Sequence, residues 1–189
     1  MKNVAILISG SGSNMFRLVE GMQAGIIHAT PALVLSDKVD ATGLEKAQSL
    51  GVPTAVVSNT EYPAADAFHS KIQEYLVSYQ IDIICLAGFM RILSADFTAS
   101  WEGKILNIHP SLLPRYKGLH THQRALDAGD TVAGCSVHIV TPELDAGPIL
   151  GQTSVPIMPN DTADVLAARV LVEEHKLYPK VLAEYLERL

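Results

Sequence analysis

The chain has 189 residues, of which 48% are hydrophobic and 18% charged, and its formal net charge is −6. This length predicts one domain over residues 1–189 and excludes a large second module. The basic residues are scattered, which disfavours nucleic acid as a partner. No apolar run reaches the roughly 20 residues of a membrane span. The start, Met1–Ser9, has the pattern of a strand and not of a signal peptide, so we expect a cytoplasmic protein.

The first half of the chain alternates short apolar runs with segments of helical length. The runs are rich in β-branched residues, as strands buried on both faces are. Gly51–Pro53 supplies a stop after the second helical segment. The expected strands are residues 4–9, 32–36, 54–57, 81–86 and 104–108, and the expected helices are 15–24, 41–50 and 64–79.

The pattern changes after the fifth strand. Two apolar segments, 134–140 and 149–156, are joined by a loop and predict an antiparallel hairpin. A long last helix is expected from about Asp161, and Pro179 is expected to kink or end it. The order of elements therefore predicts an α/β fold: a single-domain, doubly wound, mostly parallel sheet with late antiparallel strands.

The fifth strand carries two residues suited to acyl chemistry, Asn107 and His109. Residues i and i+2 of a strand point to the same face, so both side chains are expected in one pocket. An amide N–H can donate to a developing oxyanion, and an imidazole can move a proton near neutral pH. Either residue alone could also be a satisfied residue at a strand end.

A glycine loop directly follows the first strand and opens a helix. Backbone N–H groups at such a place favour an anion, and the expected holders are Gly12, Ser13 and Asn14. The third glycine of a dinucleotide fingerprint and the lysine of a P-loop are both missing, so a single phosphate monoester fits best. The alternative is a helix simply capped by Ser or Asn after a tight turn.

The loop between the two late strands supplies a candidate carboxylate, Asp145. An ionised carboxylate beside His109 would orient the imidazole and stabilise its protonated form. The alternative is an aspartate that only shapes the turn. Cys85 and Cys135 lie in apolar segments without the spacing of metal ligands, and both are expected to be packed thiols.

Five motifs carry a resemblance that covers residues from Met1 to about Tyr185. They are ISGSGSN at 8–14, LAGFMRIL at 86–93, NIHPSLLP at 107–114, GLHTH at 118–122 and DAGP at 145–148. Through them the chain resembles the folate-dependent phosphoribosylglycinamide formyltransferase family, also called glycinamide ribonucleotide transformylases. The resemblance implies a formyltransferase-type, Rossmann-like fold and a role in purine biosynthesis.

The resemblance also implies a reaction. The formyl group of 10-formyltetrahydrofolate, a co-substrate, passes to the primary amine of glycinamide ribonucleotide, without a metal or a covalent enzyme intermediate. Asn107, His109 and Asp145 match the catalytic trio of the family. Asn107 and protonated His109 then steady the oxyanion, and Asp145 keeps His109 charged and oriented.

Ligand-binding residues follow from the same matched positions. The substrate glycinamide ribonucleotide is expected to contact Gly12, Ser13, Asn14 and Glu174. The folate is expected to contact Met90, Arg91, Ile92, Leu93, Asn107, Thr141, Pro142, Glu143, Leu144 and Asp145. No membrane partner is implied, and the protein is expected to be a monomer or a homodimer.

Two residues depart from the family pattern, and several alternative functions stay open. Ala65 stands where some relatives carry an arginine near the folate glutamate tail, and Leu171 where some carry a polar residue. His120 and His122 have an H-x-H spacing, but no further ligand completes a metal site. His138 is assigned only packing. The alternative functions are a formyltetrahydrofolate hydrolase or other formyltransferase, a non-catalytic folate or phosphate-ligand binding module, and a nicotinamide dehydrogenase.

Overall fold

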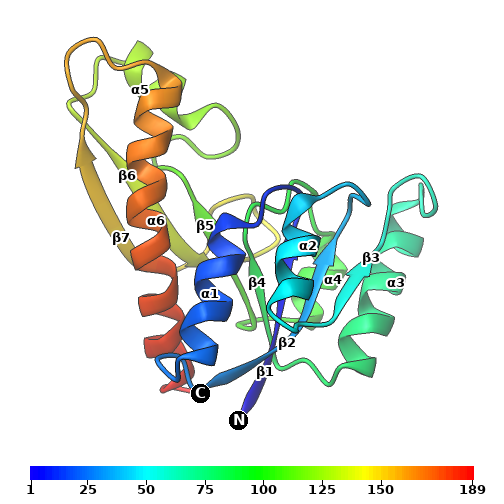
Figure 1. The fold of residues 1–189 in the computed structure, drawn as a ribbon. Helices are drawn as coiled ribbons and strands as arrows, with labels where there is room; N and C mark the ends of the chain where they lie inside the picture. The colour runs from blue at the N-terminus through cyan, green and yellow to red at the C-terminus, as the bar shows by residue number, and fades with distance from the viewer.

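The computed structural model describes residues 1–189 as a seven-stranded sheet with helices on both faces (Figure 1). The sheet order is β3-β2-β1-β4-β5-β6-β7. The strands are β1 (Lys2–Ile8), β2 (Ala29–Ser36), β3 (Thr54–Val56), β4 (Ile83–Leu86), β5 (Ile105–His109), β6 (Val132–Ile139) and β7 (Ile149–Pro156). The helices are α1 (Ser13–Gln23), α2 (Thr42–Ser49), α3 (Ala65–Ser78), α4 (Ala95–Ser100), α5 (Thr121–Asp127) and α6 (Ala163–Leu186).

The first five strands pair in parallel, and β6 and β7 are antiparallel to their neighbours. β1 lies at the centre of the parallel part, and its residues Val4–Ile8 are fully buried because both faces of the sheet are covered. One core of 29 buried residues joins the sheet to α1, α2 and α6. A second core of 17 joins the other face to α3 and α4. The predicted doubly wound sheet with late antiparallel strands is confirmed.

Most element boundaries fall within three residues of the prediction, and of the two outcomes expected at Pro179, a kink or an end, the structure excludes the end. Pro179 does not end this helix, which continues to Leu186. Burial explains why: Tyr178, Val181 and Leu182 on either side of the proline are in the core, and this packing offsets the one lost backbone hydrogen bond. Two short helices, α4 and α5, were not predicted because neither is long enough to show a period of 3.6 residues.

The carboxyl ends of β1, β4 and β5 meet at one edge of the sheet. β1 has β2 on one side and β4 on the other, so the chain changes direction there, which is where open α/β sheets bind their ligands. The predicted phosphate loop follows β1, the predicted folate segment follows β4, and the predicted catalytic pair lies at the end of β5. No helix in the structure combines the length and the apolarity that crossing a membrane would need.

Candidate active site

The loop after β1 leaves the first turn of α1 open. Gly12 occupies the N-cap position in a left-handed conformation, with φ 66°, and no side chain caps the helix. Intrahelical bonding begins with the N–H of Phe16 donating to the Gly12 carbonyl. The N–H groups before it are therefore available to an anion. The alternative of a helix capped by Ser or Asn is wrong.

Glycine is required at this N-cap by space as well as by backbone conformation. A Cβ on Gly12 would lie 2.9 Å from the Cα of Gly43 and 2.9 Å from the Cε of Met15. Gly43 in turn donates its N–H to the Gly10 carbonyl at 3.0 Å, which ties the loop to the start of α2. The loop is thus rigidly placed before any ligand arrives.

Asn14 and Glu174, 160 residues apart, meet in the core beside this loop. The Asn14 amide donates to Glu174 Oε2 at 2.7 Å, and both residues are buried. Burial raises the pKa of the Glu174 carboxyl, and the bond from Asn14 offsets this only in part. Asn14 Oδ1 is buried without a partner. The pair therefore has unused hydrogen-bonding capacity that suits a polar ligand.

Asn107 on β5 lies directly opposite His138 on β6. Its Nδ2 is 3.1 Å from His138 Nε2, and His138 Nδ1 is 3.1 Å from the Ile139 carbonyl. A carbonyl can only accept, so Nδ1 donates to Ile139, and Nε2 lies against both the Asn107 amide and the Asp145 carboxylate. This contact fixes the orientation of the Asn107 side chain in the site.

His109 and Asp145 meet as predicted. His109 Nδ1 is 3.4 Å from Asp145 Oδ2, and the two side chains are 7% and 8% exposed. The other ring nitrogen, Nε2, is 2.9 Å from the Tyr116 carbonyl. Both nitrogens face oxygen acceptors, so an imidazolium with hydrogen on each nitrogen satisfies both contacts.

Asp145 is held by three groups. Its Oδ2 accepts the N–H of Gly118 at 2.9 Å, and its Oδ1 is 3.5 Å from His138 Nε2. Burial opposes the charge, but the contact with His138, the Gly118 N–H and the nearby His109 lower the pKa of the carboxyl below its ordinary 3.8. The backbone of Asp145 is left-handed, with φ 47°, which marks a constrained loop.

The structure therefore brings Asn107, His109 and Asp145 together and adds His138, to which the sequence assigned only packing. His138 contacts both Asn107 and Asp145. The signal that could have found it is the hairpin register, because a residue opposite Asn107 on the neighbouring strand must share its face.

The predicted folate segment 90–93 follows β4 and exposes its backbone. The N–H groups of Arg91, Ile92 and Leu93 donate to no protein group. Met90 and Ile92 are exposed, whereas Leu93 is buried, and the guanidinium of Arg91 lies 5.0 Å from the centroid of the Phe68 ring. Open amides beside apolar side chains suit a flat heterocycle that carries hydrogen-bonding edges.

The predicted second wall, residues 141–145, is mostly exposed. Glu143 lies 3.4 Å from Lys117 across the site, and the Thr141 hydroxyl donates to the Glu143 carbonyl at 3.2 Å. Leu144 is 53% exposed, and Pro142 is also exposed. These residues form a loop that carries Asp145 back over the sheet.

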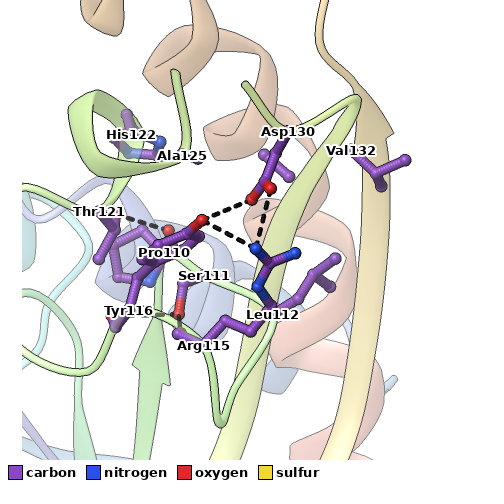
Figure 2. A pocket seen from close by; sticks show the side chains of 11 residues that line it. Pro110, Ser111, Leu112, Arg115, Tyr116, Thr121, His122, Ala125, Asp130 and Val132 are labelled. Carbon is purple, nitrogen blue, oxygen red and sulfur yellow. Dashed lines mark hydrogen bonds and ion pairs between the residues drawn. The ribbon is translucent and has the colours of Figure 1, made fainter. Parts of the chain in front are cut away.

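A polar cluster anchors the loop that reaches His109 (Figure 2). Asp130 accepts from Arg115 at 2.8 Å and from the Tyr116 hydroxyl at 2.7 Å. Tyr116 itself is left-handed, with φ 55°. The cluster holds the Tyr116 carbonyl against His109, a contact that the sequence did not predict.

His120 and His122 do not form a metal site with other residues. The structure holds no group of three or more His, Cys, Asp or Glu side chains placed to bind a metal ion. Burial and the neighbouring His109 lower the pKa of His122. Cys85 and Cys135 are buried free thiols, as predicted.

Comparisons with known proteins place the chain in a family. The formyl transferase family model matches residues 2–182. Phosphoribosylglycinamide formyltransferase of Escherichia coli is 43% identical over 96% of this chain and 85% of that protein. The bovine trifunctional purine biosynthetic protein adenosine-3 is 47% identical over 95% of this chain, which spans only 18% of that protein.

A solved structure shows the same likeness to phosphoribosylglycinamide formyltransferases. The crystal structure of phosphoribosylglycinamide formyltransferase from Brucella melitensis has a TM-score of 0.93 and 52% identity, covering 97% of this chain and 95% of that one. The fold and these likenesses agree: the chain belongs to the formyl transferase family, with phosphoribosylglycinamide formyltransferases as its relatives over nearly its whole length.

Proposed function

We propose that this chain transfers the formyl group of 10-formyltetrahydrofolate to the primary amine of glycinamide ribonucleotide. The observation that carries the proposal is the cluster of half-buried Asn107 with the nearly buried His109 and Asp145 side chains in a member of the formyl transferase family. The likeness to the Escherichia coli enzyme over 85% of that protein supports the choice of substrates.

The reaction begins when the amine attacks the formyl carbon. A C–N bond forms to the ribonucleotide, the bond from the formyl carbon to the folate nitrogen breaks, and one proton passes from the amine to that nitrogen. An amide hydrogen of Asn107 and an N–H of His109 stabilise the oxyanion between these steps. One such donor contributes about 3 kcal/mol to lowering the barrier.

Asp145 acts through His109, and His138 acts through Asn107. Asp145 orients His109, whose ring donates its proton to the leaving folate nitrogen and is then reprotonated by the proton that the attacking amine gives up. His138 fixes the amide of Asn107 through the 3.1 Å contact between its Nε2 and Asn107 Nδ2. Because a donor already turned toward the oxyanion needs no reorganisation, both contacts increase catalysis.

Substrate binding must also change one contact of the free enzyme. Both ring nitrogens of His109 are occupied, one by Asp145 and one by the Tyr116 carbonyl. Asp145 is itself fixed by the N–H of Gly118, so the Tyr116 carbonyl is the contact that gives way to the formyl oxygen. The loop anchored by Asp130 therefore shifts when the donor binds.

Glycinamide ribonucleotide and the folate bind at different places along the edge of the sheet where the carboxyl ends of β1, β4 and β5 meet. The ribonucleotide phosphate binds the open turn at Gly12, Ser13 and Asn14, with Glu174 accepting a ribose hydroxyl. The folate places its heterocycle against the amides of 90–93. A cytoplasmic location, a single domain and a monomeric or homodimeric state stay predictions from the sequence.

The test follows tetrahydrofolate formation by absorbance, with and without glycinamide ribonucleotide. Wild type should turn over only when the amine is present, and His109→Ala should lose nearly all turnover. His28→Ala is the matched control because His28 is exposed and far from the site in sequence and fold. Turnover without the amine would indicate a hydrolase, and none under either condition would indicate a binding module.

A further inference from the structure

The Ser9 side chain occupies a buried junction between three elements. Ser9 directly follows β1 and is 6% exposed, and Asp37, directly after β2, is 7% exposed. The Ser9 hydroxyl lies 2.6 Å from Asp37 Oδ1 and 2.8 Å from the backbone nitrogen of Met90. One hydroxyl thus joins the phosphate loop, the end of β2 and the folate segment.

The direction of both hydrogen bonds is fixed by chemistry. The Met90 N–H can only donate, so the Ser9 oxygen accepts from it. The Asp37 carboxylate can only accept, so the Ser9 hydroxyl hydrogen points to it. Asp37 therefore holds the hydroxyl in the one orientation that leaves a lone pair for Met90.

This junction sets where the folate segment begins. Ser9 also donates its own N–H to the Gly88 carbonyl at 3.2 Å, which is a second tie between the loops after β1 and β4. The next amides along the chain, 91–93, have no protein partner, so nothing else restrains their N–H groups. At the far end, the Ser94 N–H donates to His69 Nε2 at 3.2 Å.

We propose that Ser9 is a positioning residue for folate binding, held in place by Asp37. The inference rests on the proposed function for the identity of the ligand. Without the hydroxyl, Met90 loses its anchor and the open amides beyond it are no longer fixed in advance of binding. The affinity for folate therefore falls, because a segment that becomes ordered only when the ligand binds holds that ligand more weakly.

The test compares steady-state kinetics of Ser9→Ala, Asp37→Asn and Ser36→Ala with those of wild type. Ser9→Ala should raise the KM for 10-formyltetrahydrofolate about three- to tenfold, the value of one hydrogen bond, and change kcat less than about twofold. Asp37→Asn keeps an oxygen acceptor for the Ser9 hydroxyl, so its folate KM should stay within about twofold of wild type.

Ser36→Ala is the matched control. Ser36 is a fully buried serine next to Asp37 whose hydroxyl accepts the Lys38 N–H at 3.0 Å and does not touch the folate segment. It should lower Tm as Ser9→Ala does, and leave the folate KM unchanged. Should Ser9→Ala fail to fold, Asp37→Ala tests the same junction by removing the acceptor that orients the hydroxyl.

Three outcomes are decisive. A selective rise in folate KM with Ser9→Ala, absent in Ser36→Ala, supports the role. An unchanged folate KM in Ser9→Ala, or an equal rise in Ser36→Ala, overturns it while leaving the formyl transfer intact. A wild-type protein without turnover overturns the proposed function itself, and is seen before any variant is compared.

Discussion

Replacing Asp145 by asparagine removes the charge beside His109 and keeps the shape of the side chain. The carboxylate lies 3.4 Å from His109 Nδ1 and is 8% exposed. At that distance and an effective dielectric constant near 20, the attraction to an imidazolium is roughly 5 kcal/mol. After the cost of desolvation, a hydrogen bond to a charged group retains about 2–3 kcal/mol.

If that energy acts mainly on the transition state, kcat of Asp145→Asn falls about 30- to 150-fold. The asparagine oxygen can still accept the N–H of Gly118, so the loop should keep its place. The assay is the tetrahydrofolate absorbance measurement at saturating concentrations of both substrates. Asp164→Asn, at an exposed aspartate in the first turn of α6, is the control and should keep wild-type kcat.

The reasoning would be refuted by a kcat of Asp145→Asn within threefold of wild type. It would also be refuted if kcat stayed constant and only KM rose, because the carboxylate would then contribute to binding and not to the transition state. Circular dichroism melting of both variants separates this result from general loss of the fold.

Three further predictions concern burial, the loop and acid stability. Glu174→Gln removes a charge whose burial raises the pKa, so it should raise Tm by about 2–4 °C while increasing the KM for glycinamide ribonucleotide; an unchanged KM would remove Glu174 from the substrate site. Tyr116→Phe removes a hydrogen bond to Asp130, so trypsin should cut the loop that carries it several-fold faster than in wild type, and equal rates would show that this bond does not anchor the loop. Hydrogen bonds from Arg169 hold the pKa of Asp161 at about 2, below its ordinary 3.8, so its stabilisation is present above pH 4 and is lost as pH falls through 2. The Tm difference between wild type and Asp161→Asn should therefore shrink over that range, and a constant difference would contradict the assignment.

The sequence predicted the parts of the molecule that depend on local pattern. The apolar run Val4–Ile8 indicated a strand buried on both faces, and the spacing of Asn107 and His109 indicated side chains on one face. The glycine loop indicated an open helix terminus, and Gly12 at the N-cap bears this out. These features are set by residues close together in the chain.

The remaining features depend on contacts between distant segments. The role of His138 follows from the register between β5 and β6, and the contact of Asn14 with Glu174 spans 160 residues. Glu174 alone has the pattern of a solvated helix residue, and only its match to the family singled it out. Pro179 was expected to kink or end α6, and the helix does not end there because packing on both sides of the proline decides its length.

The Tyr116 carbonyl on His109 could not be predicted for a different reason. A backbone contact leaves no trace in residue types, and this one depends on the left-handed Tyr116, which is held by the Asp130 side chain 14 residues further along the chain. Sequence patterns report side-chain chemistry and periodicity, so loop geometry that presents a carbonyl is visible only in the structure.

Direct transfer of the formyl group is tested most directly with a donor that carries ¹³C in that group. The protein is incubated with labelled 10-formyltetrahydrofolate and glycinamide ribonucleotide, and the products are followed by ¹³C NMR. We predict that the label appears in the formyl amide of the ribonucleotide as tetrahydrofolate forms, in equal amounts. Label released as formate, or label that stays on the folate, would contradict the account.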